Sequence, residues 1–473
     1  MKKLRWAMDG AFWDLDISTP ITVDGLARPI PGDTTIPLGL SRGIKLSRPK
    51  QIDFMQRFMA MPFVPSYSGD LDKGGNGFTF QRVLNLPLGE NWFATMLGQF
   101  NVQKLVASMK QSSKQQPADS SWLKNLGKHF CDKSLYALGL CSEISIGPED
   151  TLLLSSELSG GDKKTRRNKA IFHHKFPQHN LTAEAVWPGL FVDKHGTYWD
   201  VPFLMEVDLA SVASNSGTSC HVCVHHNSGS PKQFDGDQID QIPQGLLPGL
   251  SVKTALSFKK NVDIWRSKAG KLKMVQPFDV FLSDPHISAS GCIGTVVTAS
   301  LGGNPVRPQG EDVSQSIGGI SFRGGPGNKS TILADLFATV SCTAQHGNFQ
   351  RLFLDLTRLH ARLDFPSGSK FLTGTTNLAR DLYNSKPLDM QAVQAICPEI
   401  TVSLQQQIFG EFSFRMDSKV ALDIKSRESY GARIDDTVFA FEYALKVLGS
   451  AKAVAWYSTK QREAMVELRF FET

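Results

Sequence analysis

The chain has 473 residues, enough for a large core, and its 41% hydrophobic content is typical of a folded protein rather than a disordered one. Forty glycines and 24 prolines argue against a helical bundle, because both residue types are unfavourable inside helices. The net charge of +6 is modest and says little on average, but the positive charge is concentrated in two segments of the N-terminal half.

The longest apolar stretch, Thr331–Ala344, is interrupted by Asp335, so the sequence predicts no transmembrane helix, which needs about 20 apolar residues. The start of the chain has basic residues but no apolar segment after them, and Asp9 and Asp14 make it too acidic for a transit peptide. A chain of this kind that enters a membrane is expected to do so as a closed β-barrel, the remaining way to satisfy backbone groups in lipid.

Residues 1–70 are predicted to be an irregular N-terminal segment with one short helix around Lys50–Met61. Four apolar residues of that helix recur at helical spacing, and basic residues lie among aromatic ones from residue 40 to residue 67. Two readings stay open: a short helix docked on the rest of the protein, or a site for an anionic lipid. The lipid-binding candidates here are Arg42, Lys45, Arg48, Lys50, Phe54, Arg57 and Phe58.

The same segment contains Gly39-Leu40-Ser41-Arg42-Gly43, which matches the G-x-S-x-G pattern of serine hydrolases. That motif requires a buried strand before the serine and a helix after it. Prolines precede it here and Pro49 follows soon after, so the context does not support a catalytic site. A soluble β-rich lipid hydrolase or acyltransferase using Ser41 is kept as the alternative reading.

Residues 71–133 are predicted to be a mixed segment with a polar loop at 110–120. The second basic stretch, Asp162–Phe176, follows Gly160-Gly161 and is interpreted as a mobile loop between strands. It is either a solvated run or a site for anionic lipid. Nucleic acid is not favoured, since no nucleic-acid-binding fold accompanies the charge. Its candidate lipid-binding residues are Lys163, Lys164, Arg166, Arg167 and Lys169.

From residue 134 to residue 473 the sequence predicts strand after strand, roughly 12 to 18 antiparallel strands of about ten residues, the length that crosses a bilayer. Gly410–Lys425 is interpreted as a hairpin with its turn at Asp417-Ser418, and the chain is expected to end in a hairpin around Lys460–Arg462. Other predicted strands are Ser134–Ile146, Leu181–Val192, Phe203–Val212, Val252–Ile264, Met274–Leu282, Ile287–Ala299, Arg351–Phe365 and Thr437–Val447.

One predicted strand shows both faces clearly. Arg358, His360, Arg362 and Asp364 share one face, and the residues between them are apolar. This pattern fits a barrel with a polar, charged lumen and a lipid-facing exterior, and it also fits a water-soluble sheet. The fold class is therefore predicted as all-β, a membrane β-barrel, with a soluble β-protein as the competing reading.

Other motifs predict no catalytic, metal or cofactor site. The run Cys220–His226 contains metal-ligand residue types, but no second pair lies at zinc-finger spacing and strand alternation would divide it between two faces. Arg323–Ser330 is glycine-rich but lacks the G-K-[ST] of a phosphate loop. The odd number of seven cysteines, from Cys131 to Cys397, predicts reduced thiols.

Three N-terminal stretches carry a resemblance to a known family. Trp13–Pro20, Leu38–Gly43 and Leu46–Gln51 closely resemble the plant trigalactosyldiacylglycerol lipid-transfer proteins of the chloroplast outer envelope, the fourth kind of that set. The similarity implies a β-barrel in the plastid outer envelope that binds phosphatidic acid and acts as a homodimer without enzymatic activity.

The resemblance also implies a role in moving lipid precursors from the endoplasmic reticulum towards an inner-envelope ABC-type importer for galactolipid synthesis, with contact sites between the two membranes as a candidate location. The family offers no short ligand motif, so the basic residues named above are our own assignment. A structural scaffold at contact sites is the third reading.

Overall fold

The structure is a computed structural model. It describes residues 63–68, 77–115, 127–160, 165–192, 198–211, 218–233, 246, 248–263, 286–300, 320–323, 331–346, 357–365, 367–385, 392–393, 396–423, 431–444, 451–460 and 462–470. All structural statements below refer to these residues.

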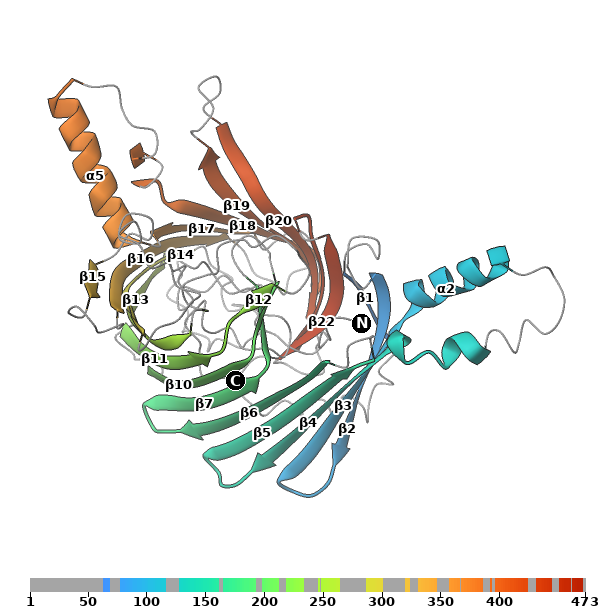
Figure 1. The fold of residues 1–473 in the computed structure, drawn as a ribbon. Helices are drawn as coiled ribbons and strands as arrows, with labels where there is room; N and C mark the ends of the chain where they lie inside the picture. Colours follow the sequence, from blue (N-terminus) through green and yellow to red (C-terminus); the bar gives the residue numbers. More distant parts are fainter. Residues whose placement is uncertain are drawn as a thin grey trace.

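A single 19-stranded sheet, curved into a barrel, dominates the molecule (Figure 1). Its first strands are β1 (Val64–Ser68), β2 (Gly77–Pro87), β3 (Trp92–Asn101), β4 (Tyr136–Ser145), β5 (Asp150–Ser159), β6 (Thr165–Lys175), β7 (His179–Trp187), β10 (Phe203–Ser211) and β11 (Thr218–Ser228). The later strands are β13 (Gly249–Asp263), β14 (His286–Ser300), β15 (Ile320–Arg323), β16 (Thr331–His346), β17 (Thr357–Phe365), β18 (Glu399–Phe409), β19 (Phe412–Asp423), β20 (Gly431–Ala444), β21 (Ala451–Ser458) and β22 (Glu463–Phe470).

A smaller sheet and a few helices complete the described chain. The smaller sheet consists of β8 (Gly189–Val192), β9 (Tyr198–Val201) and β12 (Lys232–Gln233). Trp199 and Val201 of β9 pack in one cluster with Leu204 of β10, so this sheet lies against the wall. The helices are α2 (Val102–Gln115), the 3-10 turn η2 (Lys133–Leu135) and α5 (Gly368–Tyr383).

Every pairing in the large sheet is antiparallel, and most join strands that are consecutive along the chain. β15 pairs with β16 alone, whereas β1 pairs with β2 on one side and with β22 on the other. The succession of paired strands therefore returns to its start at β1. The β1–β22 junction is short and joins three residue pairs, from Ser66 opposite Met465 to Ser68 opposite Glu463.

The strands form because apolar and polar residues alternate along them, and each strand therefore has two different faces. On β19, Ser413, Arg415 and Asp417 point to the shielded side, while Phe412 is exposed on the other. β17 repeats the arrangement: Arg362 and Asp364 are shielded on one face, and Leu359 and Leu363 are exposed on the other. The predicted common face of Arg358, His360, Arg362 and Asp364 is confirmed.

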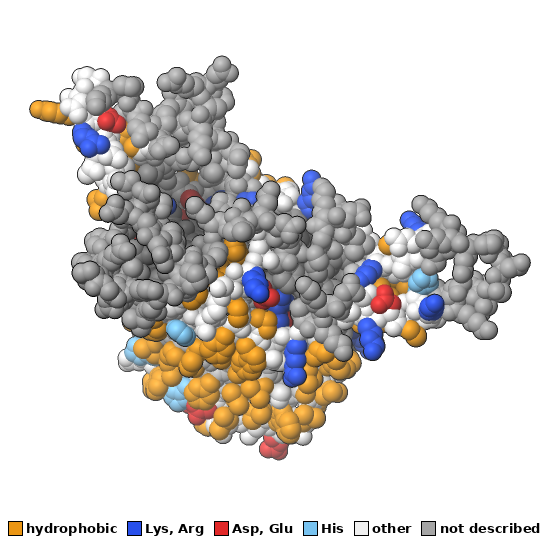
Figure 2. Space-filling model, in the orientation of Figure 1, with side chains coloured by type: hydrophobic (Ala, Val, Ile, Leu, Met, Phe, Trp, Pro, Cys, Tyr) orange, Lys and Arg blue, Asp and Glu red, His pale blue; other side chains and the backbone are white. Residues whose placement is uncertain are grey.

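Polarity is inverted relative to a water-soluble protein. The shielded inner face carries the polar residues, including Gln81, Thr339 and Gln407, whereas large apolar side chains are exposed outside. Figure 2 shows these hydrophobic side chains gathered over the part of the sheet that contains β4 to β7. The exposed apolar residues of that region include Leu138, Leu140, Leu154, Leu158 and Phe172, and the neighbouring β10 adds Met205 and Val207. A polar interior and an apolar exterior define a membrane β-barrel.

Several sequence predictions are confirmed. The C-terminal hairpin pairs Ala451–Ser458 with Glu463–Phe470, and Phe439, Phe441 and Tyr443 alternate with the buried Ala440 and Glu442. The described cysteines are free thiols. Met274–Leu282 and Lys50–Met61 lie outside the described residues. No described helix is long and apolar enough to span a bilayer.

The predicted turn at Asp417-Ser418 is wrong. Both residues lie inside β19, opposite Ser403 and Val402 of β18. The chain reverses instead next to Gly410, whose φ of 48° is in the left-handed region that glycine favours. In the sequence Asp417 resembles a turn residue because it is polar. In the structure its carboxylate points inward and accepts a hydrogen bond from Arg415.

Two further predictions are corrected. The second basic stretch is not a loop, because Thr165–Lys175 forms β6 and pairs with β5 and β7. The sheet also begins at β1, so the predicted boundary at residue 134 lies too late. The inner faces of β2 and β3 carry the polar residues Gln81, Asn85 and Gln99. Because of these residues, the sequence alone did not indicate the two strands.

A charge on the lipid-facing surface tests the membrane assignment. Leu256 is 65% exposed at the middle of β13, opposite the equally outward Ile293. Leu256→Arg should make folding into liposomes less favourable by about 2–4 kcal/mol, because the arginine would lie near the bilayer midplane. The measurement is urea titration of folding, with Leu256→Ala as the control. A change within about 0.5 kcal/mol, normal for an exposed site in water, would contradict the membrane barrel.

Candidate functional site

The inner wall at β16 and β17 carries a buried ion pair. Arg362 donates from Nε and Nη2 to Oδ1 of Asp364, at 2.9 and 2.8 Å, and the two side chains are 2% and 0% exposed. Thr339 of β16 donates to the same carboxylate oxygen at 2.8 Å. His360, on the same inner face, lies 2.7 Å from the hydroxyl of Thr343. The charge of Arg362 is therefore balanced by Asp364 on the same strand, and Thr339 of the adjacent strand adds a hydrogen bond to the pair.

A second polar network covers β18, β19 and β20. Arg415 contacts Asp417 at 3.0 Å and Glu442 at 3.7 Å. Gln405 donates from Nε2 to Ser413 at 3.2 Å and to Glu442 at 3.1 Å. A wall of this kind is rich in hydrogen-bond donors and acceptors, and Arg415 lies between two carboxylates.

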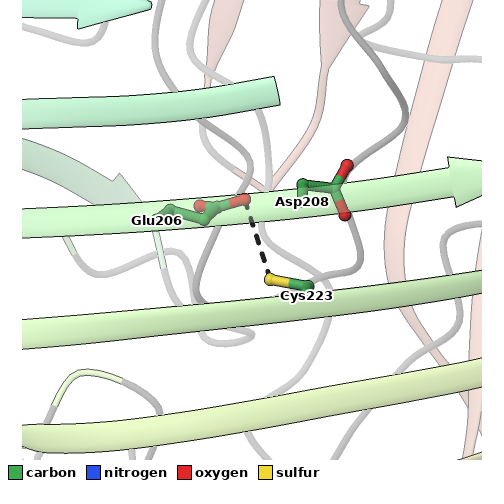
Figure 3. Close-up of side chains that lie close together, drawn as sticks. All are labelled: Glu206, Asp208 and Cys223. Atoms are coloured by element: carbon green, nitrogen blue, oxygen red, sulfur yellow. Dashed lines mark hydrogen bonds between the residues drawn. The ribbon is translucent and has the colours of Figure 1, made fainter. Parts of the chain in front are cut away.

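Across β10 and β11 the lumen presents two carboxylates and a thiol (Figure 3). Glu206 and Asp208 come from β10 and Cys223 from β11, all three are buried, and their candidate ligand atoms lie within 4.8 Å of one another. The Cys223 thiol donates to Oε1 of Glu206 at 3.7 Å. These donor types suit a divalent metal ion.

The run Cys220–His226 divides between the two faces of β11, as the sequence predicted. Cys223 and His225 face inward, whereas Cys220 and His226 are exposed. The two carboxylates near Cys223 were missed, because they come from another strand through its register: Asp208 is opposite Cys223, and Glu206 is opposite His225. The spacing of these residues along the sequence does not indicate that they are neighbours.

The inner wall also has an apolar patch. Val438 and Ala440 of β20 pack with Val454 and Trp456 of β21, and Val64 of β1 packs against them. All four clustered residues are at least 96% buried. The inner side of the wall therefore combines charged and apolar parts.

The predicted basic residues of β6 are separated by strand alternation. Arg166 is exposed and donates from Nε to Asn168 at 3.0 Å, whereas Arg167 is buried on the inner face. Lys169 is half-buried, two residues from Arg167 and so on the same face. Lys163 and Lys164 lie outside the described residues. β6 therefore directs Arg167 and Lys169 to the lumen and Arg166 to the exterior.

The charge of Arg167 also acts on Asp200 of β9. Burial raises the pKa of the Asp200 carboxyl, and the positive charges of Arg167 and Lys232 oppose that shift. Asp132, at the start of η2, shows the opposite direction. Its pKa is lowered mainly by the hydrogen bonds that it accepts from the side chain and backbone of Ser134.

The N-terminal candidates Arg42, Lys45, Arg48, Lys50, Phe54, Arg57 and Phe58, together with Ser41, lie outside the described residues. Their assignment to lipid stays a prediction. The structure shows where the chain leaves that segment: Phe63 and Val64 enter the wall at β1, beside Arg82 of β2, whose guanidinium lies 5.7 Å from the Phe63 ring centre.

The fold and the inner wall define a class of protein: a membrane β-barrel with a charged, partly apolar lumen. The chain is 54% identical over 482 aligned residues to "Protein TRIGALACTOSYLDIACYLGLYCEROL 4, chloroplastic" of Arabidopsis thaliana, and the alignment covers 100% of both chains. The chain belongs to the family of that chloroplast protein, as its N-terminal residues indicated.

Two other comparisons add less. No protein-family model matches the chain. A crystal structure of Pseudomonas aeruginosa OccK1 (OpdK) superposes with a TM-score of 0.35 at 7% identity, covering 86% of this chain and 94% of that one. At that score the similarity is loose, and the fold assignment rests on the strand pairing described above.

The raised pKa of Asp200 predicts a pH dependence of stability. Its contribution is fully present below the unfolded-state pKa of about 3.9 and is lost as the pH rises through the higher folded-state pKa. Asp200→Asn should remove this dependence, as measured by urea unfolding in liposomes at several pH values. Arg167→Gln should move the loss to higher pH, because it removes an opposing positive charge.

The matched control is Arg166→Gln, one residue away on the outer face. It should leave the pH profile where it is. Equal shifts for the two arginine variants would contradict the inward placement of Arg167 beside Asp200.

Proposed function

We propose that this protein is a phosphatidic-acid-binding lipid-transfer protein of the plastid outer envelope, which moves lipid precursors from the endoplasmic reticulum into the plastid for galactolipid synthesis. The observation that carries the proposal is the full-length identity of 54% to a chloroplast protein named for trigalactosyldiacylglycerol. Membership of that family supports lipid transfer in the chloroplast by a transporter rather than an enzyme. Homodimerisation, contact sites with the endoplasmic reticulum and delivery to an inner-envelope ABC-type importer are parts of the same proposal.

The barrel is suited to such a cargo. A glycerolipid has a charged headgroup and apolar acyl chains, and the inner wall offers a surface for each. Arg167 and Lys169 add positive charge on one side of the lumen, and the Trp456 patch offers apolar contact on another. Exclusion of acyl chains from water stabilises binding by about 0.8 kcal/mol per buried methylene group.

Phosphatidic acid is the headgroup that best matches the basic N-terminal segment. Its phosphomonoester has a second ionisation near pH 6, as phosphorylated side chains do, and a neighbouring Lys or Arg favours the more charged form. Arg42 and Arg48 can bind the terminal oxygens in bidentate fashion, with Lys45 and Lys50 as point charges. Phe54 and Phe58 would occupy the space that this small headgroup leaves between neighbouring lipids.

Removal of the N-terminal charges tests the binding site. Replacement of Arg42, Lys45, Arg48 and Lys50 by alanine should weaken binding to phosphatidate-containing liposomes, by about 1 kcal/mol for each base that contacts the surface. Binding is measured by flotation at moderate salt, and liposomes with phosphatidylserine at equal surface charge show whether the phosphomonoester is recognised.

The control removes the same number of charges elsewhere, at four exposed lysines outside both basic stretches: Lys110, Lys128, Lys133 and Lys460. This variant should bind phosphatidate nearly as the original chain does. Unchanged binding after loss of the four N-terminal bases, or an equal loss in the control, would contradict the assignment of the site.

The Gly39–Gly43 motif keeps a hydrolase or acyltransferase as the alternative function. Ser41→Ala separates the two, since a nucleophilic serine is indispensable to that chemistry. We expect the variant to transfer labelled lipid between liposomes at the original rate, with no lipid product released by either protein. Turnover of lipid that disappears in the variant would overturn the transfer proposal. A chain that binds membranes but extracts no lipid would instead be a scaffold.

A further inference from the structure

Helix α5 projects away from the barrel wall (Figure 1). It follows β17 directly and runs for 16 residues, about 24 Å at the usual rise per residue. Its N-terminal end adjoins β16 and β17 and contacts them through Ser367, Ser369 and Phe371. Beyond that end the helix presents much of its surface to its surroundings.

The beginning of α5 is fixed in direction. Ser367 is its N-cap and accepts a hydrogen bond from the Lys370 backbone N–H, and the same hydroxyl donates to Asp335 of β16. Asp335 also accepts from the Ser369 backbone N–H at 3.1 Å. A carboxylate at a helix N-terminus is favourable because the first N–H groups and the helix dipole are positive there.

The first turn lies on the lipid-facing side of the wall. Gly368 approaches Leu336 so closely that a Cβ atom at that position would lie 3.0 Å from the leucine Cβ. The rings of Phe365 and Phe371 pack edge to face with centres 5.8 Å apart. Leu336 is among the exposed apolar residues of the outer face. The first turn of the helix therefore lies next to the apolar exterior of the wall, beside Leu336 and Phe365.

The sequence of α5 is strongly amphipathic. Phe371, Leu378 and Leu382 recur at i, i+7 and i+11, and a second stripe beside them is formed by Leu372, Ala379 and Tyr383. Polar residues occupy the opposite side, including Lys370, Asn377, Arg380 and Asp381. Leu372, Leu382 and Tyr383 are 60%, 69% and 90% exposed. At the start of this face Phe371 packs against Phe365, whereas the three side chains just named remain exposed.

We propose that α5 lies in the headgroup region of the bilayer that holds the barrel, with its apolar face among the upper acyl chains. The argument is continuity: the apolar face begins at Leu336 and Phe365, which already belong to the lipid-facing surface, and the N-cap fixes the direction in which it continues. An amphipathic helix with low overall hydrophobicity binds in this way. Lys370 and Arg380 lie on its polar side, where lipid phosphates are found.

The inference is independent of the cargo, since it concerns how the barrel is seated. It gives the protein a lateral arm on the membrane surface, attached to the wall through Asp335 and Ser367. Such an arm would hold one end of the barrel at the depth of the headgroups.

Site-resolved labelling of the full-length barrel in liposomes tests the proposal. Single replacements Leu382→Cys and Asn377→Cys place a thiol on the apolar or the polar side of the same helix, both near its exposed end. We expect a membrane-impermeant maleimide to modify residue 382 several-fold more slowly than residue 377, as followed by peptide-resolved mass spectrometry, which separates these sites from native thiols such as Cys342. A polarity-sensitive dye at residue 382 should be quenched by lipids that carry a quencher just below the headgroup.

Equal labelling rates at the two sites, or no quenching at residue 382, would overturn the proposal. Protection that disappears when the protein is diluted in lipid would also overturn it, because the apolar face would then be covered by a second copy of the chain. Leu382 is exposed, and Asn377 is half-buried on the helix surface, where it accepts a hydrogen bond from Arg380 of the same helix. Folding of the barrel should therefore be retained in both variants, and it is checked by resistance to urea.

Discussion

The structure depends on one constraint: in hydrocarbon, every backbone N–H and C=O group of the wall must find its partner on a neighbouring strand. Antiparallel ladders from β2 to β22 meet that demand, and β1 joins the two ends. Once the backbone is satisfied in this way, the alternation of side chains determines what faces lipid and what faces the lumen. A residue such as Arg362 is acceptable in this wall only because it points inward and meets Asp364.

The inner wall shows how the polar face is kept at low cost. Buried charges are expensive unless paired and hydrogen-bonded, and Arg362, Arg415 and Glu442 each have partners on their own or a neighbouring strand. The resulting surface is polar, and these charges lie within hydrogen-bonded or ion-paired networks. Beside it, the Trp456 cluster leaves a part of the wall apolar, so the lumen is chemically divided.

Much of the architecture could be predicted from residue alternation, and the failures have physical causes. The faces of β17 and the C-terminal hairpin were predictable because period-2 patterns and the turn at Lys460–Arg462 are local signals. Asp417 was misread because a polar residue in mid-strand resembles a turn until its partner Arg415 is known. Glu206 and Cys223 meet only through strand register, which no spacing in one sequence reveals. Asp335 interrupts the longest apolar stretch, which argues against a spanning helix. Its hydrogen bonds to Ser367 and Ser369 at the start of α5 depend on the fold, and the sequence alone does not indicate them.

The pairing of β1 with β22 joins the first and the last strand of the large sheet. The ribosome has to synthesise β22 before this ladder can form, so the sheet cannot close while the strands before β22 are being made. Nonsense mutations that remove only the final hairpin would leave β1 and β20 as unpaired edge strands. Their free N–H and C=O groups could then pair with another extended chain.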